Sequence, residues 1–164
     1  MLAQLIKDIR TKISAIDGVK YCAVYNSQDI DSEGETNKIH DFLKPAVLIE
    51  VSDEDMEVNQ LGAGVQIYDP LKIRLHILHE EYDAMDGTLE QNLNVYTFKQ
   101  TLYAALDSFK PAGCSQWVRA GEKRDHNHTN IYKFIQEYIT TYVDKPTPDE
   151  TTLASPSISG RVFV

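Results

Sequence analysis

Several features that mark common enzymes and metalloproteins are missing from this sequence of 164 residues. The two cysteines, Cys22 and Cys114, lie far apart, so no CxxC pair of a zinc ribbon or thioredoxin-like motif is present. We interpret both as small buried hydrophobic residues in a reducing compartment. No Ser/His/Asp motif, P-loop or dinucleotide fingerprint is found, and Gly62-Ala63-Gly64 lacks the third glycine of the last. The sequence therefore predicts a protein that is not an enzyme and that has no catalytic, cofactor-binding or metal-binding residues.

Positive charge and long apolar runs are scarce as well. The chain has 16 Lys and Arg against 25 Asp and Glu, which gives a formal net charge of −9 at pH 7. Nucleic-acid binding depends on clustered basic residues that contact phosphates, so DNA binding is not the expected main activity. No run approaches the roughly 18 apolar residues of a membrane span, and the N-terminus lacks the apolar core of a signal peptide. We expect a protein without membrane contacts that is made and folded in the cytoplasm.

The clearest pattern in the chain is an alternating segment from Leu71 to Ile77. Its leucines and isoleucines alternate with Lys72, Arg74 and His76, which is the period of a strand with one buried face. Gly62 and Gly64 come just before it, where a turn or bulge needs backbone freedom. This segment predicts an antiparallel sheet.

Helical spacing occurs in two other segments, 2–16 and 88–109. Residues 130–143 fit either a helix or a strand, and their many Ile, Tyr, Phe, Thr and Val residues favour a strand. We expect an α+β domain at 1–143, with two helices on a mainly antiparallel sheet of about five strands, followed by a flexible arm at 144–164 rich in Pro, Ser and Thr. The stripe expected to be buried in the second helix consists of Leu89, Leu93, Tyr96, Leu102, Leu106 and Phe109. The expected order is α-β-β-β-α-β-β, over residues 2–16, 19–25, 45–51, 71–77, 88–109, 115–121 and 130–143.

Four of the five histidines form two close pairs, His76/His79 and His126/His128. Residues three apart on a strand point to opposite faces, so His76 and His79 cannot chelate one ion together. His126 and His128 could do so, but the sequence specifies no third ligand. We interpret all four as solvated or hydrogen-bonded side chains.

The acidic loop from Asp29 to Glu35 resembles the opening of a calcium-binding loop. Asp29, Asp31 and Glu33 stand at its positions one, three and five, and Gly34 stands at position six. Position twelve is His40 rather than the expected glutamate, and the preceding segment is strand-like. A solvated acidic loop is the preferred interpretation, and calcium binding stays open.

With these elements in order, the chain resembles the tail terminator, or tail-completion, proteins of long-tailed bacteriophages. The resemblance rests on PAVLIEV at 45–51, on LGAGVQ at 61–66 followed by IRLHIL at 73–78, on the long helix, and on the β-rich segment after DHNHTN at 125–130. It covers most of residues 1–143. The arm at 144–164 has no counterpart in this comparison.

The resemblance implies a structural virion protein at the head-proximal end of the tail, assembled in the host cytoplasm. Members of that family form a homo-oligomeric ring, a hexamer, that ends polymerisation of the tail tube and joins the tail to the head. The implied partners are other copies of the chain, the tail tube protein and a neck or head-completion protein, and DNA passes through the lumen without specific binding. The alternatives are a metal-dependent hydrolase that uses the histidines and acidic loops, and a generic cytoplasmic adaptor domain.

Overall fold

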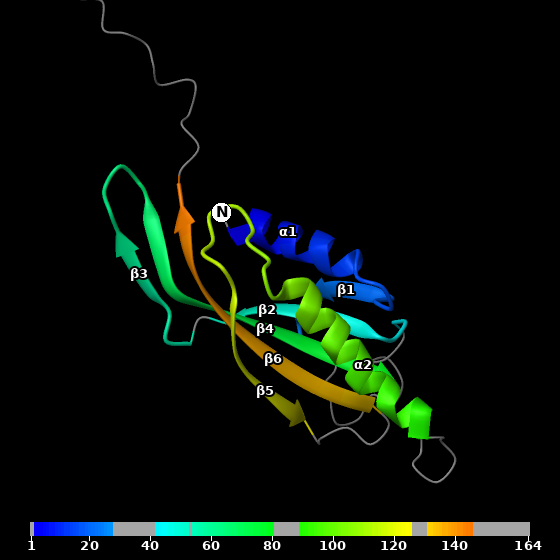
Figure 1. Cartoon of the computed structure of the whole chain (residues 1–164). Helices are drawn as coiled ribbons and strands as arrows, with labels where there is room; N and C mark the ends of the chain where they lie inside the picture. Colours follow the sequence, from blue (N-terminus) through cyan, green and yellow to red (C-terminus); the bar gives the residue numbers. More distant parts are fainter. Residues whose placement is uncertain (1, 28–41, 53, 81–88, 126–130, 146–164) are drawn as a thin grey trace, which may run out of the picture.

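The computed structural model describes residues 2–27, 42–52, 54–80, 89–125 and 131–145. They form an α+β domain in which a mixed sheet of six strands carries two helices (Figure 1). The predicted fold class is therefore confirmed. The loop 29–35, the pair His126/His128 and residues 146–164 of the predicted arm lie outside the described residues.

The sheet is built around two long strands, β4 (Gln66–Glu80) and β6 (Ile131–Asp144), which pair antiparallel along most of their length. The strand order is β1-β2-β4-β6-β5, and β3 pairs with the first part of β4. All neighbouring strands are antiparallel except β1 and β2, which run parallel. The four shorter strands are β1 (Tyr21–Val24), β2 (Ala46–Ser52), β3 (Glu57–Gln60) and β5 (Val118–Asp125).

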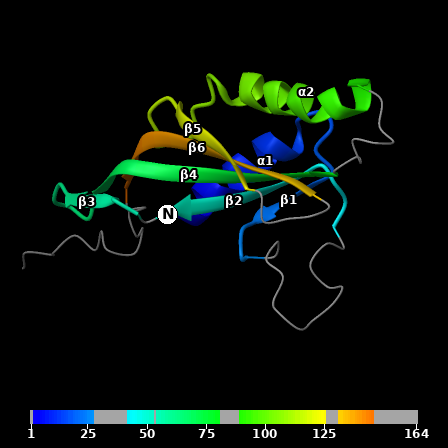
Figure 2. The ribbon, with the colours of Figure 1, turned by 90° about the horizontal axis from the view of Figure 1, so that it is seen from below.

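Both helices, α1 (Leu2–Ser14) and α2 (Leu89–Leu106), pack on the same face of the sheet (Figure 2). The main core lies between them and the sheet. The strand side chains predicted to face inward, Leu71, Ile73, Leu75 and Ile77, are all fully buried there. The α1 residues that meet them are Leu5, Ile9 and Ile13, at the spacing of an amphipathic helix.

Three sequence predictions need correction. The chain forms a sixth strand, β3, because residues 57–60 and the start of β4 make a hairpin around a turn at Gly62 and Gly64, both with positive φ. The strand expected at 115–121 begins at Val118 and continues to Asp125. In α2 the predicted stripe is partly wrong, since Leu89, Leu93 and Tyr96 are exposed. The α2 side chains that reach the core are Val95, Phe98, Leu102 and Leu106.

The segment 130–143, for which a strand was preferred over a helix, is confirmed as the strand β6. Its alternate residues Phe134, Tyr138 and Tyr142 are buried in the main core. β6 includes Asp144, so the regular structure reaches one residue beyond the expected domain end. Cys22 and Cys114 are both free and buried, as predicted.

Candidate functional site

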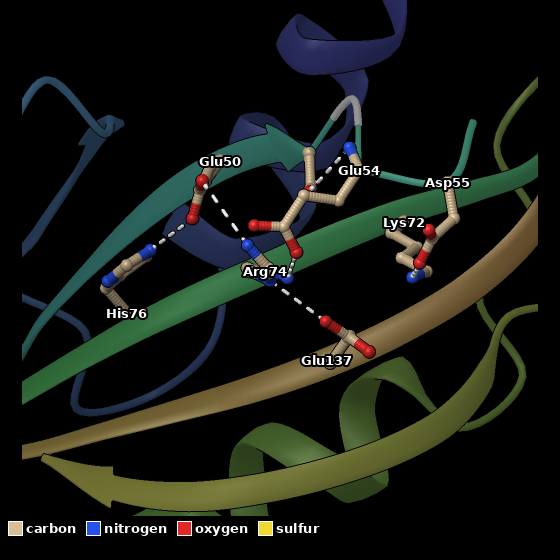
Figure 3. Close-up of polar contacts among 8 residues, drawn as sticks. Glu50, Glu54, Asp55, Lys72, Arg74, His76 and Glu137 are labelled. Atoms are coloured by element: carbon tan, nitrogen blue, oxygen red, sulfur yellow. Dashed lines mark hydrogen bonds and ion pairs between the residues drawn. The ribbon is translucent and has the colours of Figure 1, made fainter.

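The face of the sheet that points away from the helices carries the most concentrated group of charges among the described residues. Its side chains come from alternate positions of β2, β4 and β6, because successive residues of a strand point to opposite faces. Glu50, Arg74 and Glu137 are direct neighbours on the three strands, so they form one row across the sheet (Figure 3). We call this group, together with Glu54, Asp55, Lys72 and His76, the open-face cluster.

Arg74 is the centre of the cluster. Its Nε atom donates to Glu137 Oε2 at 2.9 Å, a second nitrogen donates to Glu54, and a third lies 3.8 Å from Glu50 Oε1. The hydrogen bonds to Glu54 and Glu137 raise the pKa of the Arg74 guanidinium, and the bond from Arg74 lowers the pKa of Glu54. One guanidinium therefore contacts three carboxylates from three different segments of the chain.

Lys72 forms a second, more peripheral ion pair on the same face. Its Nζ atom donates to Asp55 Oδ2 at 2.6 Å, and this bond lowers the pKa of Asp55 and raises that of Lys72. The Asp55 side chain is 81% exposed, so water screens the pair strongly. Glu54 and Asp55 both lie in the turn between β2 and β3, and the two ion pairs fix this turn against β4.

The two histidines of β4 lie on opposite faces of the sheet, as the sequence predicted. His76 is buried, its Nε2 atom lies 2.7 Å from Glu50 Oε2, and its ring stacks on Tyr25 with 3.8 Å between centroids. His79 instead contacts Phe98 of α2 on the helix side, at a centroid distance of 5.9 Å. His76 agrees with the predicted hydrogen-bonded side chain, whereas His79 is buried against Phe98 rather than solvated.

The open-face cluster contains four carboxylates but only two permanent cations, Lys72 and Arg74. The cluster therefore has an excess of carboxylates, and the cross-strand pairs hold it in a fixed arrangement, while Lys123 and Lys133 lie farther along the same face. Among the described residues, no group of three or more His, Cys, Asp and Glu side chains could hold a metal ion. The open-face cluster can therefore present carboxylates in a fixed arrangement.

Two hollows lie on the other side of the molecule. The larger, of about 570 Å³, opens between α1 and the end of β6, and Asp8 and the buried Cys114 are among its lining residues. Desolvation raises the pKa of the Cys114 thiol to about 11. A carboxylate and a protonated thiol in an apolar hollow provide no activated nucleophile.

The smaller hollow, of about 190 Å³, lies between α2 and β5. Lys99 pairs there with Glu122, and the buried Gln136 donates to Glu122 Oε2 at 2.8 Å. Burial raises the pKa of Glu122, but the hydrogen bonds from Lys99 and Gln136 outweigh it and keep the pKa below its ordinary value. These contacts join the helix to the edge of the sheet.

No family model matches the chain, and no curated protein matches it either. Within the part of the chain that the structure describes, no helix is long and apolar enough to cross a membrane.

Proposed function

We propose that this chain is a structural virion protein that caps the head-proximal end of a phage tail tube. In this proposal six copies form a ring that ends tube polymerisation and joins the tail to the head. The observation that carries the proposal is the acidic open face of the sheet. It stands beside the resemblance of LGAGVQ and IRLHIL, which form the β3–β4 turn region and the middle of β4.

A protein that surrounds moving DNA needs a surface to which phosphates do not bind. The open-face cluster supplies one, because its four carboxylates outnumber its two cations, and Arg74 and Lys72 are already paired with them. Lys123 and Lys133 lie farther along the same face. If this face lines the lumen, repulsion between carboxylates and phosphates keeps DNA from adhering during passage. The strands beneath provide a rigid support for this charge.

A tail terminator also has to contact its own neighbours, the tube and the neck. The described surface offers exposed apolar side chains that are available for such contacts. They lie in different parts of the fold: Leu61 in the β3–β4 turn, Leu89 and Leu93 on α2, and Tyr21 with Leu43 near β1. The tail tube protein and a neck protein are the partners that we assign to these surfaces.

Deletion of the gene in the phage that carries it tests the proposal directly. We expect tails whose tubes exceed the normal length and do not join heads, and we expect a plasmid copy of the wild-type chain to restore both. The control is a plasmid copy of Leu75→Asp, which places a charge in the core and should not restore either property. Tails of normal length that join heads without the chain would refute the proposal.

A further inference from the structure

Helix α2 has two apolar faces, and only one of them is covered in the described structure. Val95, Leu102 and Leu106 face the sheet and are buried. A second stripe points away from the sheet, at positions three, four or seven residues apart that share one side of a helix. Its residues are Leu89, Leu93, Tyr96 and Tyr103, which are 73%, 47%, 49% and 37% exposed.

The side of this stripe is bordered by positive charge from β5. Arg119 and Arg124 are exposed there, and Glu122, which pairs with Arg119, is the one acidic residue between Val118 and Arg124. Lys123 lies on the opposite face of the sheet, beside Ile135. The Arg119 guanidinium lies 5.1 Å from the centre of the Tyr103 ring, so the basic strand and the apolar stripe form one continuous surface. This is a basic region in a chain whose formal net charge is −9.

The hairpin of β3 and the start of β4 has the complementary properties. All four residues of β3 are exposed, Val58 to 50%, and Leu61 at the turn is 67% exposed. The segment from Ala46 to Leu71 contains acidic residues but neither Lys nor Arg. Glu57 lies in β3 itself, and Asp69 stands opposite it on β4. Glu54 and Asp55 precede the hairpin and pair with Arg74 and Lys72 on the open face. The hairpin is therefore an acidic element that ends in an apolar turn.

In both ribbon views the hairpin lies at one end of the molecule and the start of α2 at the other, with β5 between them (Figures 1 and 2). We propose that the β3–β4 hairpin of one copy docks on the outer face of α2 in the next copy. In this contact Val58 and Leu61 meet the stripe of Leu93 and Tyr96, and the acidic residues of the hairpin face the basic residues of β5. Oppositely charged surfaces that differ in shape favour a head-to-tail contact over a symmetric one.

In a row of copies joined by this head-to-tail contact, one end has an unoccupied hairpin and the other an unoccupied α2 face. Further copies can therefore add until the two ends meet and close a ring. The inference deepens the proposed function, on which it rests for the closure into a ring, by naming the contact between neighbouring subunits. It also accounts for two features that contribute little to the core of a single copy, namely an exposed hairpin and a second apolar stripe on α2.

Disulfide trapping in the full chain tests this contact, because the two natural cysteines are buried. One protein carries Leu61→Cys, and a second carries Leu93→Cys. Mixed under mild oxidation, they should form a heterodimer at least about tenfold faster than a control pair, since docking raises the effective concentration of the two thiols. The control pair is Leu61→Cys with Lys7→Cys, which places the second thiol at an exposed position on α1. Equal rates for the two pairs would overturn the proposed contact.

Charge reversal gives an independent measurement of the same contact. Glu57→Lys and Arg124→Glu should each slow the trapping reaction when introduced into both partners, and the two changes together should restore it. Both side chains are exposed, so each change should alter thermal unfolding of the single copy only slightly. No slowing by either change would contradict the charge pairing.

Trapping and gene deletion together separate this inference from the proposed function. If the deletion gives overlong tubes but Leu61→Cys and Leu93→Cys form a disulfide no faster than the control pair, the terminator function is supported and the hairpin contact is refuted. Specific trapping together with tubes of normal length would support the contact between copies and refute the terminator function.

Discussion

Arg74 and Glu137 stand directly opposite each other on β4 and β6, and Arg74 Nε donates to Glu137 Oε2 at 2.9 Å. The Arg74 side chain is 18% exposed, so this bond is less screened than an ordinary surface ion pair. Its two other nitrogens form ion pairs with Glu54 and Glu50. The arginine therefore connects the sheet to the turn between β2 and β3.

Replacing Arg74 with Gln should lower the free energy of unfolding by about 1–3 kcal/mol, since it leaves partly buried carboxylates without their charged hydrogen-bond donor. Urea unfolding at pH 7 measures the effect. Lys72→Gln is the matched control, because Lys72 lies on the same strand and face and pairs with the highly exposed Asp55. Water screens that pair, so Lys72→Gln should cost clearly less stability than Arg74→Gln. An equal loss of stability in the two variants would show that Arg74 contributes no more to the fold than Lys72.

Leu102→Ala and Leu93→Ala test which face of α2 is buried. Leu102 is fully buried, so its truncation should cost about 2–5 kcal/mol through lost contacts and a cavity. Leu93 is 47% exposed, and its truncation should change the stability of the single copy by no more than about 0.5 kcal/mol. Thermal unfolding of dilute protein distinguishes the two. A large loss of stability from Leu93→Ala would show that the stripe predicted from the sequence is the buried one.

The error in that prediction has a physical origin. Both stripes of α2 have helical spacing, and the sequence contains no information on which one faces the sheet. Leu102 and Leu106 were assigned correctly because they follow the strict spacing of the buried stripe, whereas Leu89 and Leu93 are equally apolar but exposed. A helix that covers a core on one side and an interface on another gives a mixed pattern in the sequence.

The strands were more predictable, because β4 and β6 alternate between a buried face and a partly exposed one. The open-face cluster was not predicted as a unit, since Glu50 and Glu137 are distant in sequence and only the register with β4 aligns them with Arg74. Glu50, the single acidic residue in the apolar segment PAVLIEV, could have indicated the cluster from the sequence. A charge in an otherwise buried strand requires a partner on a neighbouring strand.

Acidification should reveal the contribution of Glu122. Its folded-state pKa is held below the ordinary value by its hydrogen bonds, so its stabilising contribution is present above the unfolded-state pKa and is lost as the pH falls through the folded-state pKa. This loss of stability is expected below about pH 4.3, the ordinary pKa of glutamate. Glu122→Gln should therefore lose less stability than the wild type between pH 7 and pH 3 in urea titrations. An identical loss in both proteins would contradict this role.

Cys22 and Cys114 should be unreactive in the folded protein. Both are buried, and desolvation raises the pKa of each thiol to about 11, so the reactive thiolate is rare at pH 8. We expect no labelling by a thiol reagent at pH 8 without denaturant, and labelling of both residues in urea. Rapid labelling of Cys114 alone in the folded protein would show that the hollow beside α1 opens widely in solution.

The acidic open face makes a prediction about DNA. Glu54 and Asp55 are 64% and 81% exposed on that face, so Glu54→Lys/Asp55→Lys should turn it into a surface that attracts phosphates. We expect this variant to bind double-stranded DNA with an affinity that falls steeply with salt, in conditions where the wild type does not bind. The matched control is Asp17→Lys/Asp107→Lys, which makes the same change in charge at two exposed positions elsewhere on the fold. If both variants gain equal affinity, total charge alone explains the result and the open face has no special relation to DNA. A gain confined to Glu54→Lys/Asp55→Lys, in a protein that is still folded at the assay temperature, would support the orientation of this face toward the lumen.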